Sequence, residues 1–543
     1  MTTRVAELLG GWNVLRNPLL VKSVRQRLRV RDLVAWCAVT VLVTTLVFVG
    51  TYFTATERNL ADPTAAARAA FVPIMFIQGF ILIFLGTGSV ASGITVERMD
   101  GTLDYHRMTP MSPTAKILGY LFGLPVREYV MFLTTVPFVV ICVVKGGLGV
   151  LRVAELYLVF FVSTWLYHMT GMVAGMIARR PRRAGWFARL MVIALYLLFP
   201  RFASFGFTFL GHLTFLPAWY AIMAGELQLA ARGADLARYD TVRFFTVALR
   251  PTLYSLLVQG GLLVCFFSIV RRKWLQATSH AFSKGGALVF HGAVQVLVLG
   301  SLWPFLTGQR TIAFVADGVV QLRHQWAGVF YCFFFISGLS GLALIHSITP
   351  SRHAFGRGLR RARKLGWRRV RWSADEAGGL FSALVLGVIT LGSYLALVYL
   401  GLPDDHLRRW NFCATGHLAL VALVLTTHHL VHVSSALWGT RGLMAVIGLV
   451  WLFPLAVALI LVSAWSAVVP ASYVATFSPA ATYLYAVLYL FDLTTTPEPF
   501  AQVTGQLGPL LMVSVILNVA IGLVLQVLLV RQRQRLRRLQ RAA

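Results

Sequence analysis

Residues 33–53 read LVAWCAVTVLVTTLVFVGTYF, an uninterrupted run of apolar and small residues without a single charged side chain. A helix rises about 1.5 Å per residue, so a run of this length can cross the roughly 30 Å hydrocarbon core of a bilayer. Strands of a membrane barrel would be shorter and would alternate apolar with polar residues. The stretch therefore predicts a transmembrane α-helix.

Similar runs recur along the whole chain. Its 543 residues are 58% hydrophobic and only 13% charged, which is more apolar surface than a soluble fold can cover. We predict an all-α, polytopic transmembrane protein with about twelve spans in two six-helix halves. The predicted spans are residues 33–53, 70–92, 126–144, 155–177, 187–207 and 252–270 in the first half, and 287–307, 325–347, 378–401, 411–435, 443–467 and 508–530 in the second.

The net charge of +30 is distributed in the way that membrane topology requires. Basic residues flank the apolar runs, which is the positive-inside pattern and not a nucleic-acid-binding patch. The pattern predicts a multi-pass protein of the bacterial inner (cytoplasmic) membrane with both termini in the cytoplasm. We expect the arginine-rich segments to lie near anionic lipid headgroups.

The same topology gives a domain organisation. Residues 1–32 form a cytoplasmic N-terminal amphipathic segment, and 531–543 form a basic cytoplasmic tail. The two six-span halves are residues 33–275, with a cytoplasmic loop at 95–125, and residues 276–530, with a basic cytoplasmic loop at 348–376.

Two partly apolar segments, 208–250 and 468–507, each precede the last span of their half. We predict short outer-face or re-entrant helices there, because a full span over 472–490 would place the C-terminal tail outside. The matching layout indicates an internal repeat. Met108-Thr109-Pro110 and Ile348-Thr349-Pro350 occupy equivalent positions in the two halves.

The loop after the second span carries the most informative motif. It reads ERMDGTLD over Glu97–Asp104 and continues with MTPMSP over Met108–Pro113. Gly101 permits a tight turn, and Pro110 and Pro113 break or start helices. The loop is therefore predicted to form a compact helical element on the cytoplasmic membrane face.

This loop resembles the one that follows the second span in type-2 ABC-exporter permeases. The resemblance covers the first half of the chain and extends to the second only in layout, because the second half lacks the Glu-x-x-x-Gly-Thr-Leu portion. It implies a coupling helix that docks on a separate ATPase subunit. The residues that would carry coupling are Glu97, Asp100, Gly101, Thr102, Leu103, Pro110 and Pro113. Glu97 and Asp100 would pair with basic groups of that partner or lock the loop to its own chain; the alternative is a solvated turn without a partner.

A histidine stripe suggests a different chemistry. His428 and His432 share a helix face, and His417 lies about three turns earlier on that face. Such a stripe can bind a metal or haem, but no second ligand-bearing helix is evident, so interhelical hydrogen bonding or a polar lining is the preferred interpretation. We predict no metal site and no cofactor in this chain.

Two further absences bound the function. Acidic residues are nearly missing from the predicted spans, which disfavours an ion-coupled carrier. The chain has no G-x-x-x-x-G-K-[ST] phosphate loop, so ATP would be bound by a partner subunit and the chain itself would be no enzyme.

These observations lead to one preferred function and two alternatives. The preferred function is the membrane-spanning permease subunit of an ABC exporter with cytoplasmic ABC ATPase subunits. Membrane lipids and further envelope proteins are the other candidate partners, and nucleic acid is not one. The first alternative is a non-transporting membrane scaffold or anchor with the same fold. The second is a membrane enzyme built on the histidine stripe. No substrate-binding residue is identifiable from the sequence.

Overall fold

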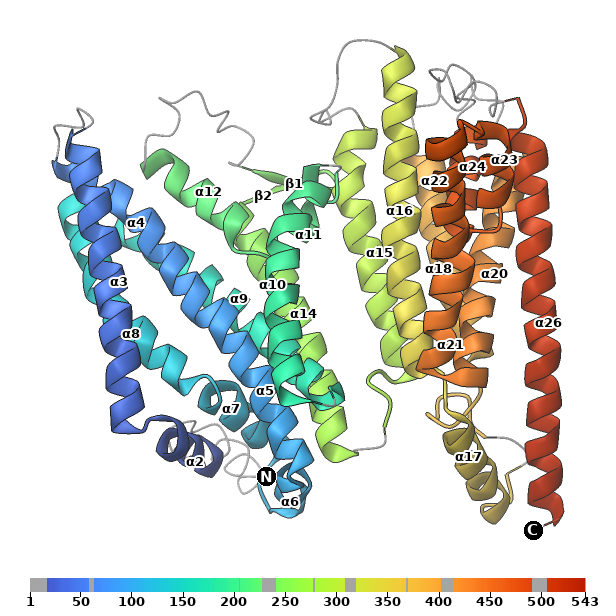
Figure 1. Cartoon of the computed structure of the whole chain (residues 1–543), viewed down its shortest axis with the longest axis horizontal. Helices are drawn as coiled ribbons and strands as arrows, with labels where there is room; N and C mark the ends of the chain where they lie inside the picture. Colours follow the sequence, from blue (N-terminus) through green and yellow to red (C-terminus); the bar gives the residue numbers. More distant parts are fainter. Residues whose placement is uncertain are drawn as a thin grey trace. The chain divides into compact units, whose positions relative to one another are not determined.

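The computed structural model describes residues 17–57, 63–178, 180–204, 206–226, 241–276, 279–307, 319–367, 370–401, 414–490 and 505–542. These residues are almost entirely helical, and their one sheet is a two-stranded hairpin (Figure 1). Twelve of the described helices are long and apolar enough to cross a membrane. The prediction of an all-α polytopic membrane protein is therefore confirmed.

Each of the twelve predicted spans overlaps one of these long helices. The first six are α3 (Val30–Glu57), the continuous α4–η2–α5 (Pro63–Gly79, Phe80–Leu85 and Gly86–Met99), α8 (Val126–Gly146), α9 (Val150–Ile177), α10 (Pro181–Ser204) and α14 (Pro251–Leu275). The second six are α15 (Lys284–Leu306), α16 (Val319–Ile348), α18 (Leu380–Gly401), α20 (Ala414–Trp438), the continuous α21–η4–α22 (Thr440–Ala445, Val446–Leu452 and Phe453–Trp465) and α26 (Leu507–Ala542).

The chain divides into two compact units, Met1–Ser279 and His280–Ala543. Each unit contains six of the twelve long helices that the described residues form. The division lies within a few residues of the boundary predicted between 275 and 276. The predicted N-terminal segment is described only from Asn17, and the rest of it lies outside the described residues.

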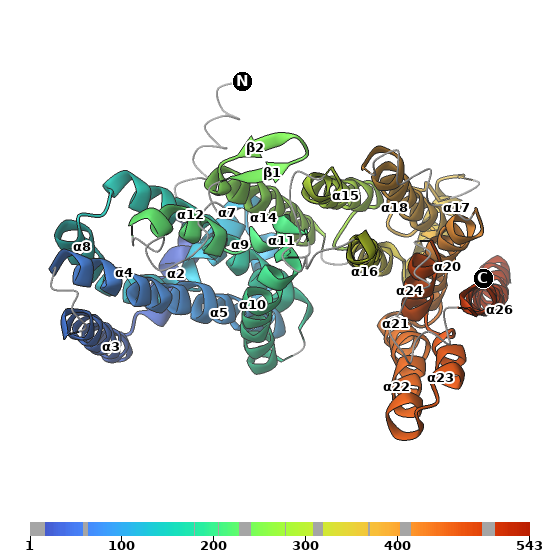
Figure 2. The same ribbon diagram turned by 90° about the horizontal axis from the view of Figure 1, so that it is seen from above.

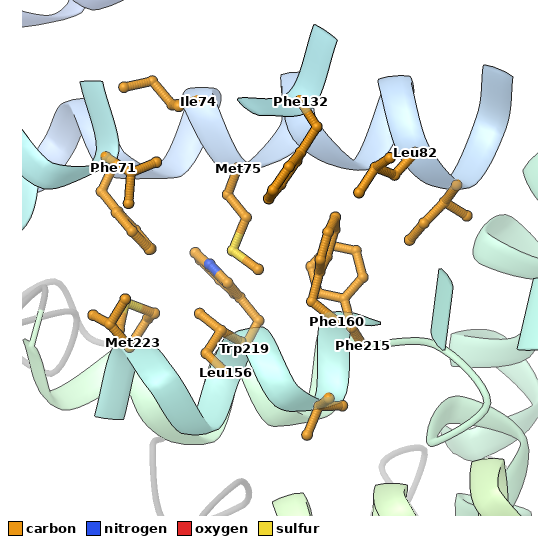
Figure 3. Packing of buried hydrophobic residues seen from close by; sticks show 14 of the residues in the cluster. Phe71, Ile74, Met75, Leu82, Phe132, Leu156, Phe160, Phe215, Trp219 and Met223 are labelled. Atoms are coloured by element: carbon orange, nitrogen blue, oxygen red, sulfur yellow. The ribbon is translucent and has the colours of Figure 1, made fainter. Parts of the chain in front are cut away.

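In one core cluster of the first unit, aromatic and sulfur-containing side chains pack among aliphatic ones (Figure 3). Phe71 and Met75 of α4 face Phe160 of α9 and Trp219 and Met223 of α12 (Leu216–Glu226). Lipid solvates apolar groups as well as a protein core does, so close packing and dispersion, not escape from water, hold such a core together.

Small residues let α5 and α9 approach closely. A Cβ added to Gly171 of α9 would lie 2.7 Å from the Thr87 carbonyl oxygen, and one on Gly175 would lie 2.6 Å from that of Ala91. The four-residue spacing places both glycines on one helix face, which is the small-xxx-small arrangement of membrane helix pairs. These two glycines therefore set the distance between the second and fourth spans.

The two segments predicted to interrupt the span pattern do so. In the first unit α11 (Thr208–Gly211) and α12 are followed by a hairpin of β1 (Val242–Phe244) and β2 (Val247–Leu249). In the second unit α23 (Val468–Ala475) and α24 (Pro479–Leu490) are separate short helices. Residues 472–490 therefore do not form one continuous spanning helix. The hairpin was not predicted.

A buried polar cluster joins three helices of the second unit. The Nδ1 atom of His291 on α15 lies 3.1 Å from Ser340 Oγ on α16. Its Nε2 atom lies 2.9 Å from Thr390 Oγ1 on α18. Ser337 Oγ donates to Gln295 Oε1 at 3.2 Å, one turn further along α15. Such hydrogen bonds inside a membrane bundle fix the register of the helices that share them.

Candidate functional site at the end of the second span

The motif-bearing loop folds into two short helices, α6 (Thr102–Met108) and α7 (Pro113–Gly123). The turn between α5 and α6 depends on Gly101, whose φ of 71° lies in the left-handed region that favours glycine. A Cβ at Gly101 would meet no atom within 4 Å, so the backbone angle and not space requires a glycine there. Thr102 starts α6, and Leu103 is buried and anchors it.

The Thr-Pro segment ends α6 and starts α7. Thr109 is extended, as a residue before a proline prefers, and its hydroxyl donates to the His106 carbonyl at 2.8 Å. Ser112 caps α7 by accepting from the Ala115 N–H at 3.2 Å, and Pro113 follows at the first helical position. The predicted compact helical element is therefore present, while its role stays a prediction.

Lys116, near the start of α7, contacts the C-terminal end of α6. Its side chain is buried, and Nζ donates to the Thr109 carbonyl at 3.1 Å and to the Arg107 carbonyl at 3.4 Å. These are carbonyls at the C-terminal end of α6 that the helix itself leaves unsatisfied. Burial lowers the pKa of the Lys116 ammonium.

Glu97 binds its own chain. Its carboxylate receives Lys22 Nζ of α2 (Pro18–Arg27) at 2.8 and 3.1 Å, and the Tyr120 hydroxyl of α7 donates to it at 3.3 Å. Burial, and then the nearby Glu97 charge, raise the pKa of Tyr120. Of the two roles considered for Glu97, these contacts favour the locking of the loop to the same chain.

The amphipathic helix α2 lies directly on α7. Asn17 caps α2 by accepting from the Leu19 N–H at 3.0 Å, and its Nδ2 donates to the Ala115 carbonyl at 2.6 Å. Gly119 and Gly123 make room for this contact, since added Cβ atoms would lie 2.7 Å from Asn17 Oδ1 and 2.8 Å from Ser23 Oγ. The N-terminal helix is thus part of the same assembly as the motif.

Two arginines attach the element to other spans. The Arg98 guanidinium donates to the Met176 and Ala178 carbonyls, and so caps the C-terminal end of α9. Arg107 pairs with Asp104, donates to the Lys273 carbonyl at 3.2 Å and lies 5.9 Å from the centre of the Trp274 ring on α14. Arg98, at the end of α5, therefore links the second span to the fourth, and Arg107 links α6 to the sixth.

Large apolar and aromatic side chains at the end of α5 and in α6 are exposed. Met99, Tyr105 and Met108 are 58%, 63% and 79% exposed. Asp100 and Pro110 are also exposed, and no described contact uses the Asp100 carboxylate. Exposed apolar groups beside charged ones, on a rigid support, are typical of a protein interaction site.

The second unit has only part of this element. Ser351 caps α17 (Arg352–Lys364) by accepting from the Ala354 N–H at 3.3 Å, directly after Thr349 and Pro350. This start matches that of α7. Among the described residues, however, no helix equivalent to α6 stands between α16 and α17. The difference agrees with the missing Glu-x-x-x-Gly-Thr-Leu portion.

The three histidines of the predicted stripe bind separate partners within the second unit. His417 Nδ1 lies 2.8 Å from the Tyr394 hydroxyl, His428 Nδ1 lies 2.7 Å from the Val424 carbonyl, and His432 Nδ1 lies 3.2 Å from the Thr349 hydroxyl. Within the described ranges, no three side chains of His, Cys, Asp or Glu gather in a metal-binding group.

A histidine–glycine contact recurs in the two units. A Cβ on Gly86 of the second span would lie 2.5 Å from His168 Nε2 on the fourth span. A Cβ on Gly341 of α16 would lie 2.7 Å from His428 Nε2 on α20, which are the second and fourth long helices of their unit. Nothing in the sequence pairs these residues, because the contact forms only once the helices are packed.

Sequence reasoning missed Arg98, Lys116 and Tyr120, which fix the element in place. The available signal was weak, since a basic or tyrosine side chain beside a span is usually a membrane anchor. Comparison with protein-family models, with curated proteins and with solved structures finds no match to this chain.

Proposed function

We propose that this multi-pass membrane protein is the permease subunit of an ABC exporter of a bacterial inner membrane, driven by separate cytoplasmic ATPase subunits. The observation that carries the proposal is the α6 element. Tyr105 and Met108 of α6 are exposed beside Met99 at the end of α5, while Arg98 and Arg107 bond the same segment to the spans.

Coupling needs a connection between the surface that the partner binds and the ends of the spans, and the contacts of Arg98 and Arg107 would supply it. A partner that pushes on α6 acts directly on Arg107, which holds a carbonyl at the end of α14. Through the Gly101 turn it acts on Arg98 of α5, which holds carbonyls at the end of α9. The Lys22–Glu97 pair and the Lys116 contacts would oppose a movement of α6 and α7 that leaves the spans in place. If the ATP-bound partner binds one arrangement of the spans more tightly than the other, ATP binding shifts the spans towards that arrangement.

The test is co-purification from native membranes in mild detergent, with substitutions on the exposed face. We expect the tagged chain to recover an ATPase subunit. Met108→Asp places a charge on a residue that is 79% exposed, and we expect it to lower recovery about tenfold, as for a central interface contact. Val247→Asp, in the hairpin and 55% exposed, is the matched control and should leave recovery unchanged.

Two outcomes would overturn the proposal. One is that no ATPase is recovered with the wild-type chain. The other is that charge reversal at Glu97 and the Met108 substitution leave both assembly and transport unchanged.

A scaffold function is the second candidate, and the second unit favours it. A symmetric exporter would be expected to have two coupling elements, whereas the described part of the second unit lacks a counterpart of α6. A scaffold would recover a partner through the same exposed face without ATP hydrolysis by the complex. Measuring ATPase activity of the purified complex therefore separates the two functions.

A further inference from the structure

We propose that the second unit binds an anionic phospholipid in a groove at the end where α21 begins and α26 ends. Figure 1 shows α17 at this same end of the unit. The groove encloses about 850 Å³ and is lined by residues of α17, α20, α21, η4 and α26. This volume lies within the range of about 300–1,000 Å³ that is common for small-molecule sites.

The polar end of the groove is basic. Arg352 and Arg441 line it together with His353, and none of its described lining residues is acidic. Arg441 is exposed, and none of the hydrogen bonds between described residues engages its guanidinium. Guanidinium groups match the geometry of a phosphate group, so the charge complementarity selects an anionic headgroup.

The other end of the groove is apolar. Its walls there are Val446, Leu449 and Val450 of η4 and Ile521 and Leu525 of α26. Leu449 is 67% exposed, and it lies about 12 Å along the helix from Arg441. Both walls belong to helices that are long and apolar enough to cross a membrane, so the apolar end lies deeper than the basic end. A lipid with a phosphate headgroup and an acyl chain fits this order, whereas a soluble phosphate would leave the apolar end uncovered.

The walls of the groove are fixed to one another. The Arg352 Nε donates to the Leu437 carbonyl at 3.0 Å, which joins α17 to the end of α20. The Arg533 guanidinium lies 5.1 Å from the centre of the Phe355 ring, which joins α26 to α17. Trp438, 48% exposed, stands at the basic end, where interfacial aromatic residues meet headgroups. These contacts hold α17 against α20 and α26, the helices that line the groove with it.

Photocrosslinking in nanodiscs tests the proposal. The full chain is reconstituted in phosphatidylcholine with a trace of a phosphatidylglycerol that carries a diazirine in its acyl chain, and crosslinked peptides are identified by mass spectrometry. We expect crosslinks in residues 445–450 and 521–525. Unlabelled phosphatidylglycerol should compete for them more strongly than phosphatidylcholine does.

Three variants separate the contributions. Arg441→Gln should lower the crosslink yield about fivefold, the effect of one basic group near a lipid surface. Arg357→Gln changes an exposed arginine of α17 outside the groove and should leave the yield unchanged. Leu449→Trp narrows the apolar end and should lower the yield for phosphatidylglycerol and phosphatidylcholine probes alike.

Equal yields from the wild type and Arg441→Gln would overturn the proposal, and so would equal competition by the two lipids. Displacement of the probe by soluble glycerol phosphate as effectively as by phosphatidylglycerol would show a headgroup site without lipid specificity. That result would also overturn it.

Discussion

The ion pair between Lys22 and Glu97 gives the sharpest test of how α2 is held against the second span. We consider Lys22→Met and Glu97→Gln, each of which removes one charge and keeps most of the side-chain shape. The pair is joined at 2.8 Å, and the Tyr120 hydroxyl contributes a further hydrogen bond to Glu97. Loss of either charge should loosen α2 without unfolding the spans.

The magnitude follows from the burial of the two side chains. A fully exposed pair contributes about 0–1 kcal/mol, and a hydrogen bond to a charged group contributes about 1.5–3 kcal/mol. The Lys22 and Glu97 side chains are 30% and 15% exposed, so the pair lies between these limits. We expect each substitution to lower the free energy of opening of α2 by about 1–2 kcal/mol.

Hydrogen exchange of the α2 amides measures this opening directly. A loss of 1–2 kcal/mol corresponds to exchange about 5 to 30 times faster over Pro18–Arg27, with the spans unaffected. Arg25→Gln is the matched control, because Arg25 is exposed on the same helix and should leave exchange unchanged. In a double-mutant cycle the two effects should not add. If they add within about 0.5 kcal/mol, the pair is not coupled and the reasoning is wrong.

Three further predictions concern backbone geometry and pH. Gly101→Ala should destabilise the α5–α6 turn by about 1–2 kcal/mol, because alanine disfavours the positive φ of this residue while an added Cβ meets no other atom. Gly101→Asn should have a smaller effect, because asparagine tolerates a positive φ better. Hydrogen exchange of the α6 amides measures both effects. Gly175→Val should lower the unfolding free energy by about 1–3 kcal/mol in mixed-micelle denaturation, since its side chain would collide with the Ala91 carbonyl. Gly260→Ala, with no atom within 4 Å of the added Cβ, is the control for that measurement. Burial, and then the charge of Lys22, lower the pKa of His106 in the folded protein, so protonation of His106 favours the open form of α6. Hydrogen exchange of α6 should therefore accelerate as the pH falls below about 6.5, the ordinary pKa of histidine. His106→Gln should abolish this pH dependence.

The span layout was accessible from sequence because each long helix must satisfy a local requirement. A run such as residues 33–53 has to be apolar along its whole length to cross the bilayer, whatever it packs against. The short helices around residues 472–490 were predicted on a different ground, because a full span there would place the basic C-terminal tail outside. Sequence reasoning missed the hairpin of β1 and β2, because segments of three residues carry no recognisable periodicity.

The candidate site was predictable only in part, because its contacts join residues far apart in the chain. The turn at Gly101 and the helix start at Pro113 are encoded locally, and both were found. The partners of Glu97 and Arg98 are not, since Lys22 and Met176 lie in other elements and nothing nearby in sequence marks them. The sequence therefore left open whether Glu97 pairs with a partner or with its own chain, because nothing in it identifies Lys22 as the neutralising group.

The recurring histidine–glycine contact and the absent counterpart of α6 show where the described parts of the two units are alike and where they differ. His168 on Gly86 and His428 on Gly341 give the second and fourth long helices of each unit the same kind of close contact, as the predicted repeat would require. One difference between the described parts of the two units lies between α16 and α17, where the chain passes directly from Ile348 through a Thr-Pro turn into a basic helix. Under the proposed function, one unit would receive the force of the ATPase and the other would respond to it. Grafting residues 97–109 between Ile348 and Thr349 would then add a second docking site, and the number of ATPase subunits recovered per chain should rise.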